Sequence, residues 1–185
     1  MRLRPRKLPF RKYTVRSAVA VIYRNSKAKG PELLLIERAQ REGDPWSGHM
    51  AFPGGKVQAN DANTLSAAIR ETWEEIGLDI NLSAQYKGRL TDLLTRRHNH
   101  LRPMVVTPYL FELLDEVELN FNHEVADTVW IPFDFFIDKS NRSSMKWKAG
   151  SVNLKMPCYY YQNKCIWGLT YLMLKDLIND QLNPL

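Results

Sequence analysis

The chain has 185 residues, of which 44% are hydrophobic and 25% are charged, which is ordinary for a single globular domain. Its formal net charge is +6, but ten basic residues and no acidic residue precede Glu32, so the rest of the chain carries −4. No apolar run approaches the ~20 residues that a membrane-spanning helix needs, and no signal peptide is visible. A helical membrane protein and a secreted protein are therefore not expected.

The basic N-terminal end is expected to be separate from the folded domain. Pro5 and Pro9 oppose a helix there, so we predict a flexible arm at 1–12 and one domain at 13–185. Such an arm could contact nucleic acid, an anionic membrane or an import receptor, although a solvated leader is the simpler interpretation. The two cysteines, Cys158 and Cys165, are read as reduced thiols of a cytoplasmic protein.

Two apolar runs near the start are typical of buried strands. Residues 17–23 and 32–37 are separated by a polar turn, so we expect a hairpin at the centre of a sheet that is covered on both faces. A polar, turn-rich stretch then leads to the double glycine Gly54-Gly55, where the backbone can approach a ligand closely.

The segment after these glycines has the pattern of an amphipathic helix. Asn63 or Asp61 can cap its start, and Gly77 suits a left-handed cap at its end. A largely apolar stripe with helical spacing is formed by Leu65, Ile69, Thr72 and Ile76.

Three glutamates of this helix, Glu71, Glu74 and Glu75, fall on an arc about 140° from the apolar stripe. Carboxylates at this spacing repel one another, and the helix dipole disfavours negative charge near a C-terminus. Arg70 can relieve only part of that repulsion. A divalent cation would turn the repulsion into attraction, because Mg²⁺ binds carboxylate oxygens. A solvated acidic face and a metal site are both compatible with the pattern.

With the residues before it, this segment resembles the signature box of the Nudix hydrolases, which is a Gly, a spacer, an acidic residue and then Arg-Glu-x-x-Glu-Glu-x-Gly-apolar. The residues that fit are Gly55, Arg70, Glu71, Glu74, Glu75, Gly77 and Leu78. The spacer is one residue longer than the commonest one, Asp61 replaces a Glu, and Thr72 replaces an aliphatic residue. The longer spacer, led by Phe52-Pro53-Gly54-Gly55, is similar to the branch that includes coenzyme A pyrophosphatases. The resemblance extends from about Val15 to Asn179 and implies an α/β fold, a Nudix-type α/β/α sandwich with a mixed β-sheet.

Further strands are expected at 86–93, 104–113 and 128–132, followed by a short helix at 133–137. A polar, cationic loop at 95–100 contains Arg96, Arg97, His98 and His100 and can overhang a site, although a solvated connector is equally consistent with it. The other predicted elements are a variable excursion at 138–154, a hairpin of 157–161 with 164–167 that turns near Gln162-Asn163, and a helix from Gly168 that packs on the sheet opposite the glutamate helix.

The resemblance assigns roles to residues of this chain. Glu71, Glu74 and Glu75 would hold one to three Mg²⁺ or Mn²⁺ ions with the Gly55 carbonyl, and Arg70 would orient Glu71. Glu124, which precedes a strand, would complete the metal site, assist the attacking water or contact the base. Arg38, Arg96 and Arg97 are candidates for phosphate contacts. Tyr159, Tyr160, Tyr161 and Trp167 could stack a base, but core packing is the simpler expectation for them.

The implied activity is metal-dependent hydrolysis of a pyrophosphate bond in a nucleoside diphosphate linked to another group, with coenzyme A or its derivatives as the first candidate. Part of the coenzyme A signature is present, in Leu34-Leu35-Ile36-Glu37-Arg38 and in Gly48 to Gly55, while a Ser and a second Arg are missing. The alternatives are ADP-ribose, a dinucleotide or an oxidised nucleotide as the substrate, or a domain that binds nucleotide or RNA without hydrolysis. A small-molecule partner is expected, nucleic acid is not favoured, and the sequence predicts no oligomeric state.

Overall fold

A computed structural model of the protein describes residues 5–43, 46–96, 102–149 and 152–182. The strands are β1 Val15–Ser26, β2 Gly30–Arg38, β3 Met50–Ala51, β4 Gly54–Lys56, β5 Ala84–Arg89, β6 Leu93–Arg96, β7 Pro103–Leu113, β8 Val125–Pro132, β9 Arg142–Ala149, β10 Val152–Tyr161 and β11 Lys164–Trp167. The helices are α1 Thr64–Ile76, α2 Ile80–Ser83, α3 Phe133–Ile137 and α4 Gly168–Leu182, with short 3-10 turns at Arg11–Tyr13 and Lys139–Asn141. Among these residues, no helix is long and apolar enough to cross a membrane.

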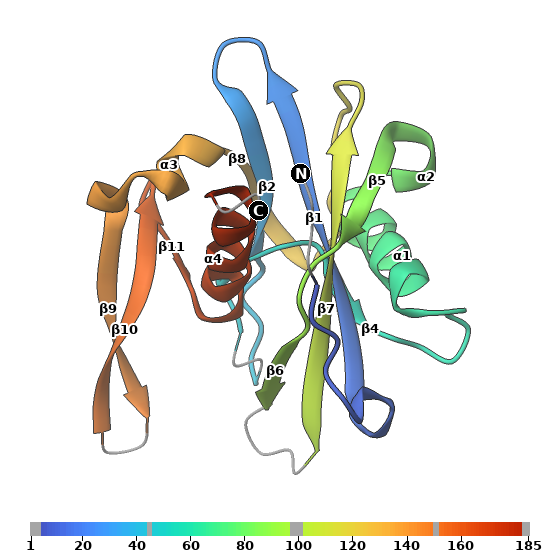
Figure 1. Cartoon of the computed structure of the whole chain (residues 1–185), viewed down its shortest axis with the longest axis horizontal. Coiled ribbons are helices and arrows are strands. Elements are labelled where there is room, and N and C mark those ends of the chain that lie inside the picture. Colours follow the sequence, from blue (N-terminus) through green and yellow to red (C-terminus); the bar gives the residue numbers. More distant parts are fainter. Residues whose placement is uncertain (1–4, 44–45, 97–101, 150–151, 183–185) are drawn as a thin grey trace.

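A mixed sheet crosses the centre of the molecule (Figure 1). Its main path is β3-β2-β1-β7-β5, and β4, β6 and β8 pair with β1, β7 and β2 respectively. β1 and β7 run parallel, whereas β1 and β2 form the expected antiparallel hairpin. The apolar run Leu33–Ile36 of β2 is buried on both of its faces, as its lack of alternation predicts.

Helices cover both faces of this sheet, which confirms the expected α/β/α layering. On one face, α1 packs its alanines Ala67 and Ala68 against Ala18 and Ala20 of β1. On the other face, α3 and α4 pack around Val21 and the alternate residues of β2. α4 therefore lies on the sheet opposite α1, as expected (Figure 1).

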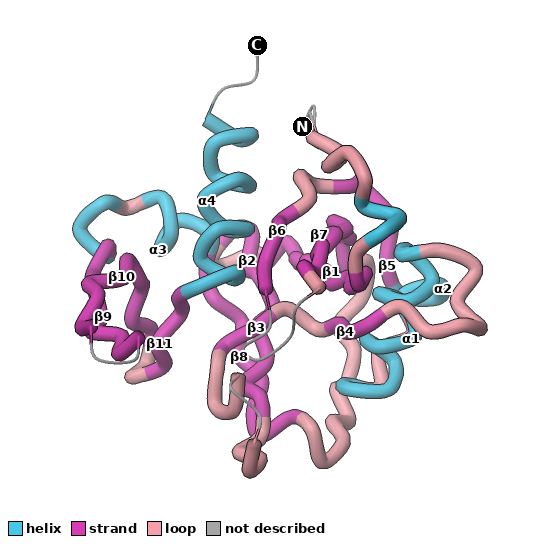
Figure 2. Tube along the Cα trace, turned by 90° about the horizontal axis from the view of Figure 1, so that it is seen from below, coloured by secondary structure: helices cyan, strands magenta, loops and turns pink. Residues whose placement is uncertain are grey.

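The excursion expected at 138–154 is mostly regular structure, which corrects that expectation. β9 and β10 pair along their lengths, and β11 adds to them a third antiparallel strand in a sheet of their own. Figure 2 shows this small sheet beside α4, on the side away from α1. The predicted β10–β11 hairpin is present, and its turn residues Gln162 and Asn163 both have positive φ, as a tight two-residue turn requires. In the β10–β11 register, Cys158 is opposite Trp167 and Cys165 is opposite Tyr160, so the two cysteines are not cross-strand partners. Both thiols are free.

The strand expected at 86–93 is broken into β5 and β6, and the break is where the N-terminal segment is attached. The backbone N–H of Asp92 donates to the carbonyl of Arg6 (3.0 Å), and the N–H of Leu8 donates to the Asp92 carboxylate (3.0 Å). Arg11 also forms an ion pair with Asp92, at 3.5 Å. Residues 6–11 thus lie against the domain, while the functional boundary at residue 13 stays a prediction.

Candidate functional site

Helix α1 carries the glutamates, and the sequence fixes both of its ends. The Asn63 side chain accepts hydrogen bonds from the N–H groups of Leu65 and Ser66, and the Ser66 hydroxyl accepts one from the Asn63 N–H in return. Gly77 ends the helix with φ 66°, the left-handed conformation that its position predicts. Because both ends are fixed, the register of the glutamates on the helix is fixed as well.

Glu75 is buried, with 2% of its surface exposed, although the helical wheel placed it opposite the apolar stripe. The cause is the β3–β4 segment, which folds over this side of α1 and donates the Gly54 N–H to the Glu75 carboxylate at 2.8 Å. Burial raises the pKa of Glu75 to about 8, against the effects of the Gly54 hydrogen bond and the charge of Arg38. The charges of Glu71 and Glu124 add to the rise.

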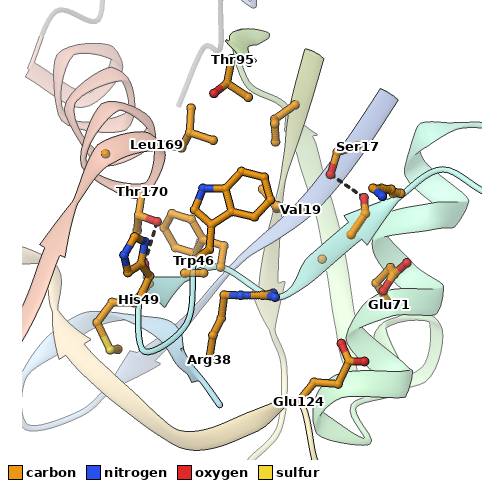
Figure 3. A pocket seen from close by; sticks show the side chains of 18 of the residues that line it. Ser17, Val19, Arg38, Trp46, His49, Glu71, Thr95, Glu124, Leu169 and Thr170 are labelled. Atoms are coloured by element: carbon orange, nitrogen blue, oxygen red, sulfur yellow. Dashed lines mark hydrogen bonds between the residues drawn. The ribbon is translucent and has the colours of Figure 1, made fainter. Parts of the chain in front are cut away.

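Glu71 lies against Gly55, and a larger residue at position 55 would displace the Glu71 carboxylate. A Cβ on Gly55 would lie 2.4 Å from the Glu71 carboxyl carbon. Burial raises the pKa of Glu71 as well, while the ion pair with Arg70 opposes the rise and the charges of Glu74 and Glu124 add to it. The Gly55 carbonyl accepts a hydrogen bond from the Ser17 hydroxyl at 2.6 Å, which holds this backbone oxygen beside the cluster (Figure 3).

Arg70 holds the glutamate helix to the preceding loop. It forms ion pairs of 2.9 Å with Asp61, Glu71 and Glu74, and it donates to the carbonyl of Lys56 at 3.1 Å. The expected ion pair with Glu71 is therefore present, and Asp61 braces the loop in place of the usual Glu. The hydrogen bond from Arg70 lowers the pKa of Asp61.

Glu124 faces the glutamates from the loop before β8. Its carboxylate accepts a hydrogen bond from Arg41 at 3.0 Å, and its backbone is tied to the end of β2, where Ala39 N–H donates to its carbonyl at 2.8 Å. Arg38 lies at that same end of β2 and is close enough for its charge to lower the pKa of Glu75. Helix α1, the end of β2 and the loop before β8 therefore place charged groups around one point.

These residues line one cleft of about 1560 Å³. In the view of Figure 3, Glu71 and Glu124 lie on one side of it and His49 and Thr170 on the other, with Arg38 and Trp46 between them. The complete set of lining glutamates is Glu42, Glu71, Glu74, Glu75 and Glu124. This volume is ample for a nucleotide-sized ligand.

The side chains of the cluster do not form a ready metal site, although their chemistry fits one. Within the described ranges, no three carboxylate, imidazole or thiol groups are arranged to hold an ion as they stand, because Glu71 and Glu74 turn toward Arg70 and Glu75 turns toward Gly54. The chemistry of the donors nevertheless suits a hard cation. The charges of Glu74 and Glu124 add to the rise in the pKa of Glu71, and the charges of Glu71 and Glu124 add to the rise in the pKa of Glu75, so these carboxylates gather uncompensated negative charge in one cleft. The residues therefore fit a divalent ion, provided that their side chains reorient.

Comparisons with known proteins decide the family. Residues 14–148 match the family model of the NUDIX domain. The chain belongs to the Nudix hydrolase family. Members of this family are pyrophosphohydrolases, enzymes that cleave phosphoanhydride bonds.

Individual relatives agree with this assignment. The chain is 30% identical over 148 residues to an uncharacterised Nudix hydrolase, NudL, of Yersinia pestis, covering 80% of this chain and 71% of that protein. It is 34% identical over 105 residues to the uncharacterised protein C14C4.10c of Schizosaccharomyces pombe, covering 55% of this chain but only 32% of that longer protein.

Among solved structures, an Ap4A hydrolase of C. elegans in a binary complex is similar, with a TM-score of 0.55, 26% identity, and coverage of 66% of this chain and 83% of that one. A MutT/nudix family protein of Enterococcus faecalis has a TM-score of 0.56 at 18% identity, covering 94% of this chain and 62% of that one, and supports the fold.

The side chains of two predicted phosphate contacts, Arg96 and Arg97, lie outside the part of this Nudix domain that the structure describes. Of Arg96, only the backbone at the end of β6 is described, and Arg97, His98 and His100 lie outside the described residues. Their predicted roles stay predictions. Gly55, Arg70, Glu71, Glu74, Glu75, Glu124 and Arg38 are brought together by the fold.

Sequence reasoning missed several residues of the Nudix cleft, among them Ser17, Trp46 and Trp147. Ser17 stands in an apolar strand run, where a hydroxyl that supports a loop carbonyl has no sequence signal. Trp147 lies in the segment that was expected to be a variable excursion. The sequence does not show that Trp147 lies near Trp167, because this follows only from the register of β9, β10 and β11.

Proposed function

We propose that this Nudix hydrolase cleaves the pyrophosphate bond of coenzyme A or its derivatives, with Mg²⁺ or Mn²⁺ bound at the glutamate cluster. The observation that carries the proposal is the pair of the half-buried Glu71 and the buried Glu75, whose pKa values are raised and which share a cleft with Arg38. Hydrolysis of a diphosphate requires cations that neutralise charge on the phosphate oxygens and a base that takes a proton from water. A divalent ion held by the glutamates, together with Arg38, would supply the first, and one of the carboxylates would supply the second.

Each residue of the cluster is proposed to have one task. Glu71, Glu74, Glu75 and the Gly55 carbonyl would hold the metal, which when bound neutralises charge on the phosphate oxygens and lowers the pKa of water. Glu71 is the leading candidate for taking the proton from the attacking water, and Glu124 is the alternative. Arg70 is a positioning residue, because its ion pair orients Glu71.

Arg38 is proposed to contact the diphosphate. A guanidinium can donate two parallel hydrogen bonds to a phosphate, and Arg38 lines the cleft next to Glu75. It is also the residue at which the chain keeps the coenzyme A signature. The second cation of that signature is missing from its usual position. Arg41, Arg96 and Arg97 are the candidates to replace it from other loops, and Arg41 is paired with Glu124.

The identity of the substrate is tested by incubating the protein with a panel of diphosphates and identifying the products by mass. Coenzyme A should yield a 3′,5′-phosphorylated adenosine and phosphopantetheine, and only when Mg²⁺ or Mn²⁺ is present. Dephospho-coenzyme A should be poorer by roughly tenfold to a hundredfold in kcat/KM, the effect of losing one charged hydrogen-bond pair of ~1.5–3 kcal/mol. Equal values for the two substrates would reject a 3′-phosphate contact.

A second candidate substrate is a dinucleoside polyphosphate, which the 26% identity to the C. elegans Ap4A hydrolase favours. A higher kcat/KM on Ap4A or ADP-ribose than on coenzyme A would replace the first proposal with this one. No hydrolysis of any diphosphate with either metal would favour a nucleotide- or RNA-binding domain instead. Free thiols at Cys158 and Cys165 support the proposal of a cytoplasmic location.

A further inference from the structure

The cleft continues past the glutamates to an end that is lined by four rings, Trp46, His49, Trp147 and Trp167, here called the aromatic end. The ring centroids of His49 and Trp167 lie 4.9 Å apart with an interplanar angle of 63°, and those of Trp147 and Trp167 lie 6.1 Å apart at 47°. The rings come from the loop before β3, from β9 and from β11, so the fold gathers them from three separate segments.

Packing does not account for Trp147. Its side chain is 39% exposed, and it lies on a cleft wall, whereas Tyr159 on the neighbouring strand is 2% exposed and packs against α3. An indole that serves only the core would be covered like Tyr159. The adjacent Lys148 also lines the cleft and adds a positive charge at this end.

The aromatic end and the glutamate cluster are joined by one short stretch of chain. The His49 carbonyl accepts a hydrogen bond from the Arg38 N–H at 3.1 Å, and the next carbonyl, of Met50, accepts one from the Thr170 hydroxyl at 2.9 Å. This stretch then continues to Gly54, the donor to Glu75. A ligand with its diphosphate at the glutamates can therefore reach the rings without leaving the cleft.

We propose that the aromatic end binds the base of the substrate's nucleotide by stacking, with Trp147 as the main platform and Trp167 supporting it. The proposal rests on the function proposed above for the position of the diphosphate. It is favoured over an aliphatic ligand because aromatic faces bind flat heteroaromatic rings well, and because Lys148 suits a phosphorylated nucleoside. It makes the small sheet of β9, β10 and β11 part of the binding site.

The test is binding of AMP to the full-length protein in EDTA, with ribose 5-phosphate as the base-free probe. Trp147→Ala should raise the Kd for AMP by about tenfold to a hundredfold, the usual range for loss of one stacked base, and should leave the Kd for ribose 5-phosphate unchanged. Trp147→Phe should retain most of the affinity for AMP. The matched control is Leu154→Ala, because Leu154 is the cross-strand partner of Trp147, is 41% exposed and does not line the cleft.

An AMP affinity that is unchanged in Trp147→Ala, or an equal loss for both probes, would overturn the proposal. If Trp147→Ala fails to fold, nuclear Overhauser effects between adenine and indole protons in the wild type give the answer, and their absence at saturating AMP would overturn it as well. Because no hydrolysis is measured, this result is separable from the proposed function. If AMP stacks on Trp147 but no diphosphate is hydrolysed, the proposed substrates are rejected, while the proposal that the aromatic end binds a base stands.

Discussion

Glu75 and Asp92 are both buried carboxylates, with 2% and 4% of their surface exposed, yet their pKa values move in opposite directions. Burial acts to raise the pKa of Asp92, but hydrogen bonds from the Thr107 hydroxyl, the Leu8 N–H and Arg89 outweigh it and lower the pKa. For Glu75, burial prevails over a single backbone donor and raises the pKa to about 8. A buried carboxylate therefore points to a functional site when its surroundings leave the charge uncompensated.

The largest expected effect is on catalysis, through Glu75→Gln. This change removes an oxygen that is proposed to bind the metal, at nearly constant shape, so kcat/KM should fall by about 10²–10⁴-fold, equivalent to a few kcal/mol of transition-state stabilisation. The metal-free variant should be as stable as the wild type or more stable, because Gln, unlike Glu75, does not have to take up a proton when it is buried. Steady-state kinetics with Mg²⁺ and urea unfolding in EDTA measure the two effects, and near-normal turnover would reject the assignment.

Asp92→Asn should have the opposite profile. It leaves Arg89 and Arg11 facing a neutral group, and breaking a buried ion pair from one side lowers the free energy of unfolding by about 3–5 kcal/mol. Turnover per folded molecule should stay within a few-fold of the wild type, since Asp92 does not line the cleft. A stable Asp92→Asn protein with lost activity would reverse the roles given to the two carboxylates.

The same contrast predicts opposite pH dependences in metal-free protein. Glu75 has a folded pKa near 8, above its ordinary value of 4.5, so its contribution to stability is full below pH 4.5 and is lost as the pH rises toward 8. The free energy of unfolding should fall by up to roughly 4 kcal/mol between pH 5 and pH 8.5 from this group. Urea unfolding in EDTA at both pH values tests it, and Glu75→Gln should lack that fall.

Asp92 supplies the other limb of the profile. Its lowered pKa stabilises the fold above its ordinary value of 3.8, and this stability is lost as the pH falls through the lower, folded pKa. Asp92→Asn should flatten the acid limb and leave the alkaline one as it is in the wild type. If both variants gave the wild-type profile, neither carboxylate would control it.

The smallest of these effects is expected from removing residues 1–12. A protein that begins at Tyr13 loses the Leu8 donor and the Arg11 charge at Asp92, so its free energy of unfolding should fall by about 1–3 kcal/mol. Its turnover on small diphosphates should persist, because the described residues of the arm do not line the cleft. Lost turnover in a folded, truncated protein would place the arm in the site and move the domain boundary.

The sequence predicted those elements that are determined by residues close together in the chain. The double-sided burial of β2 followed from its unbroken apolar run, and the ends of α1 followed from Asn63 and Gly77. The turn at Gln162-Asn163 and the mismatch of the two cysteines followed from hairpin geometry. The attachment of the N-terminal segment at the break between β5 and β6 could not be read in this way, because Arg6 and Leu8 lie more than 80 residues from Asp92 in the sequence.

Most residues of the candidate site were predictable, but their environment was not. Charge repulsion on one helix indicated Glu71, Glu74 and Glu75 from the sequence alone. Which of them is buried depends on the β3–β4 segment that folds over α1, and helical periodicity carries no information about that segment. Trp147 is the clearest omission, since its place in the cleft depends on the register of three strands.

The central claim is that the glutamate cluster on α1 holds a divalent ion. Calorimetric titration with Mn²⁺ at pH 8.5 tests this claim most directly. The wild type and Glu75→Gln are compared, and Asp92→Asn is the control for a buried carboxylate outside the cleft. We expect saturable binding by the wild type and by the folded Asp92→Asn protein, and a Kd at least about tenfold higher for Glu75→Gln, since one charged ligand is lost. Equal Mn²⁺ affinity in wild type and Glu75→Gln would contradict the account.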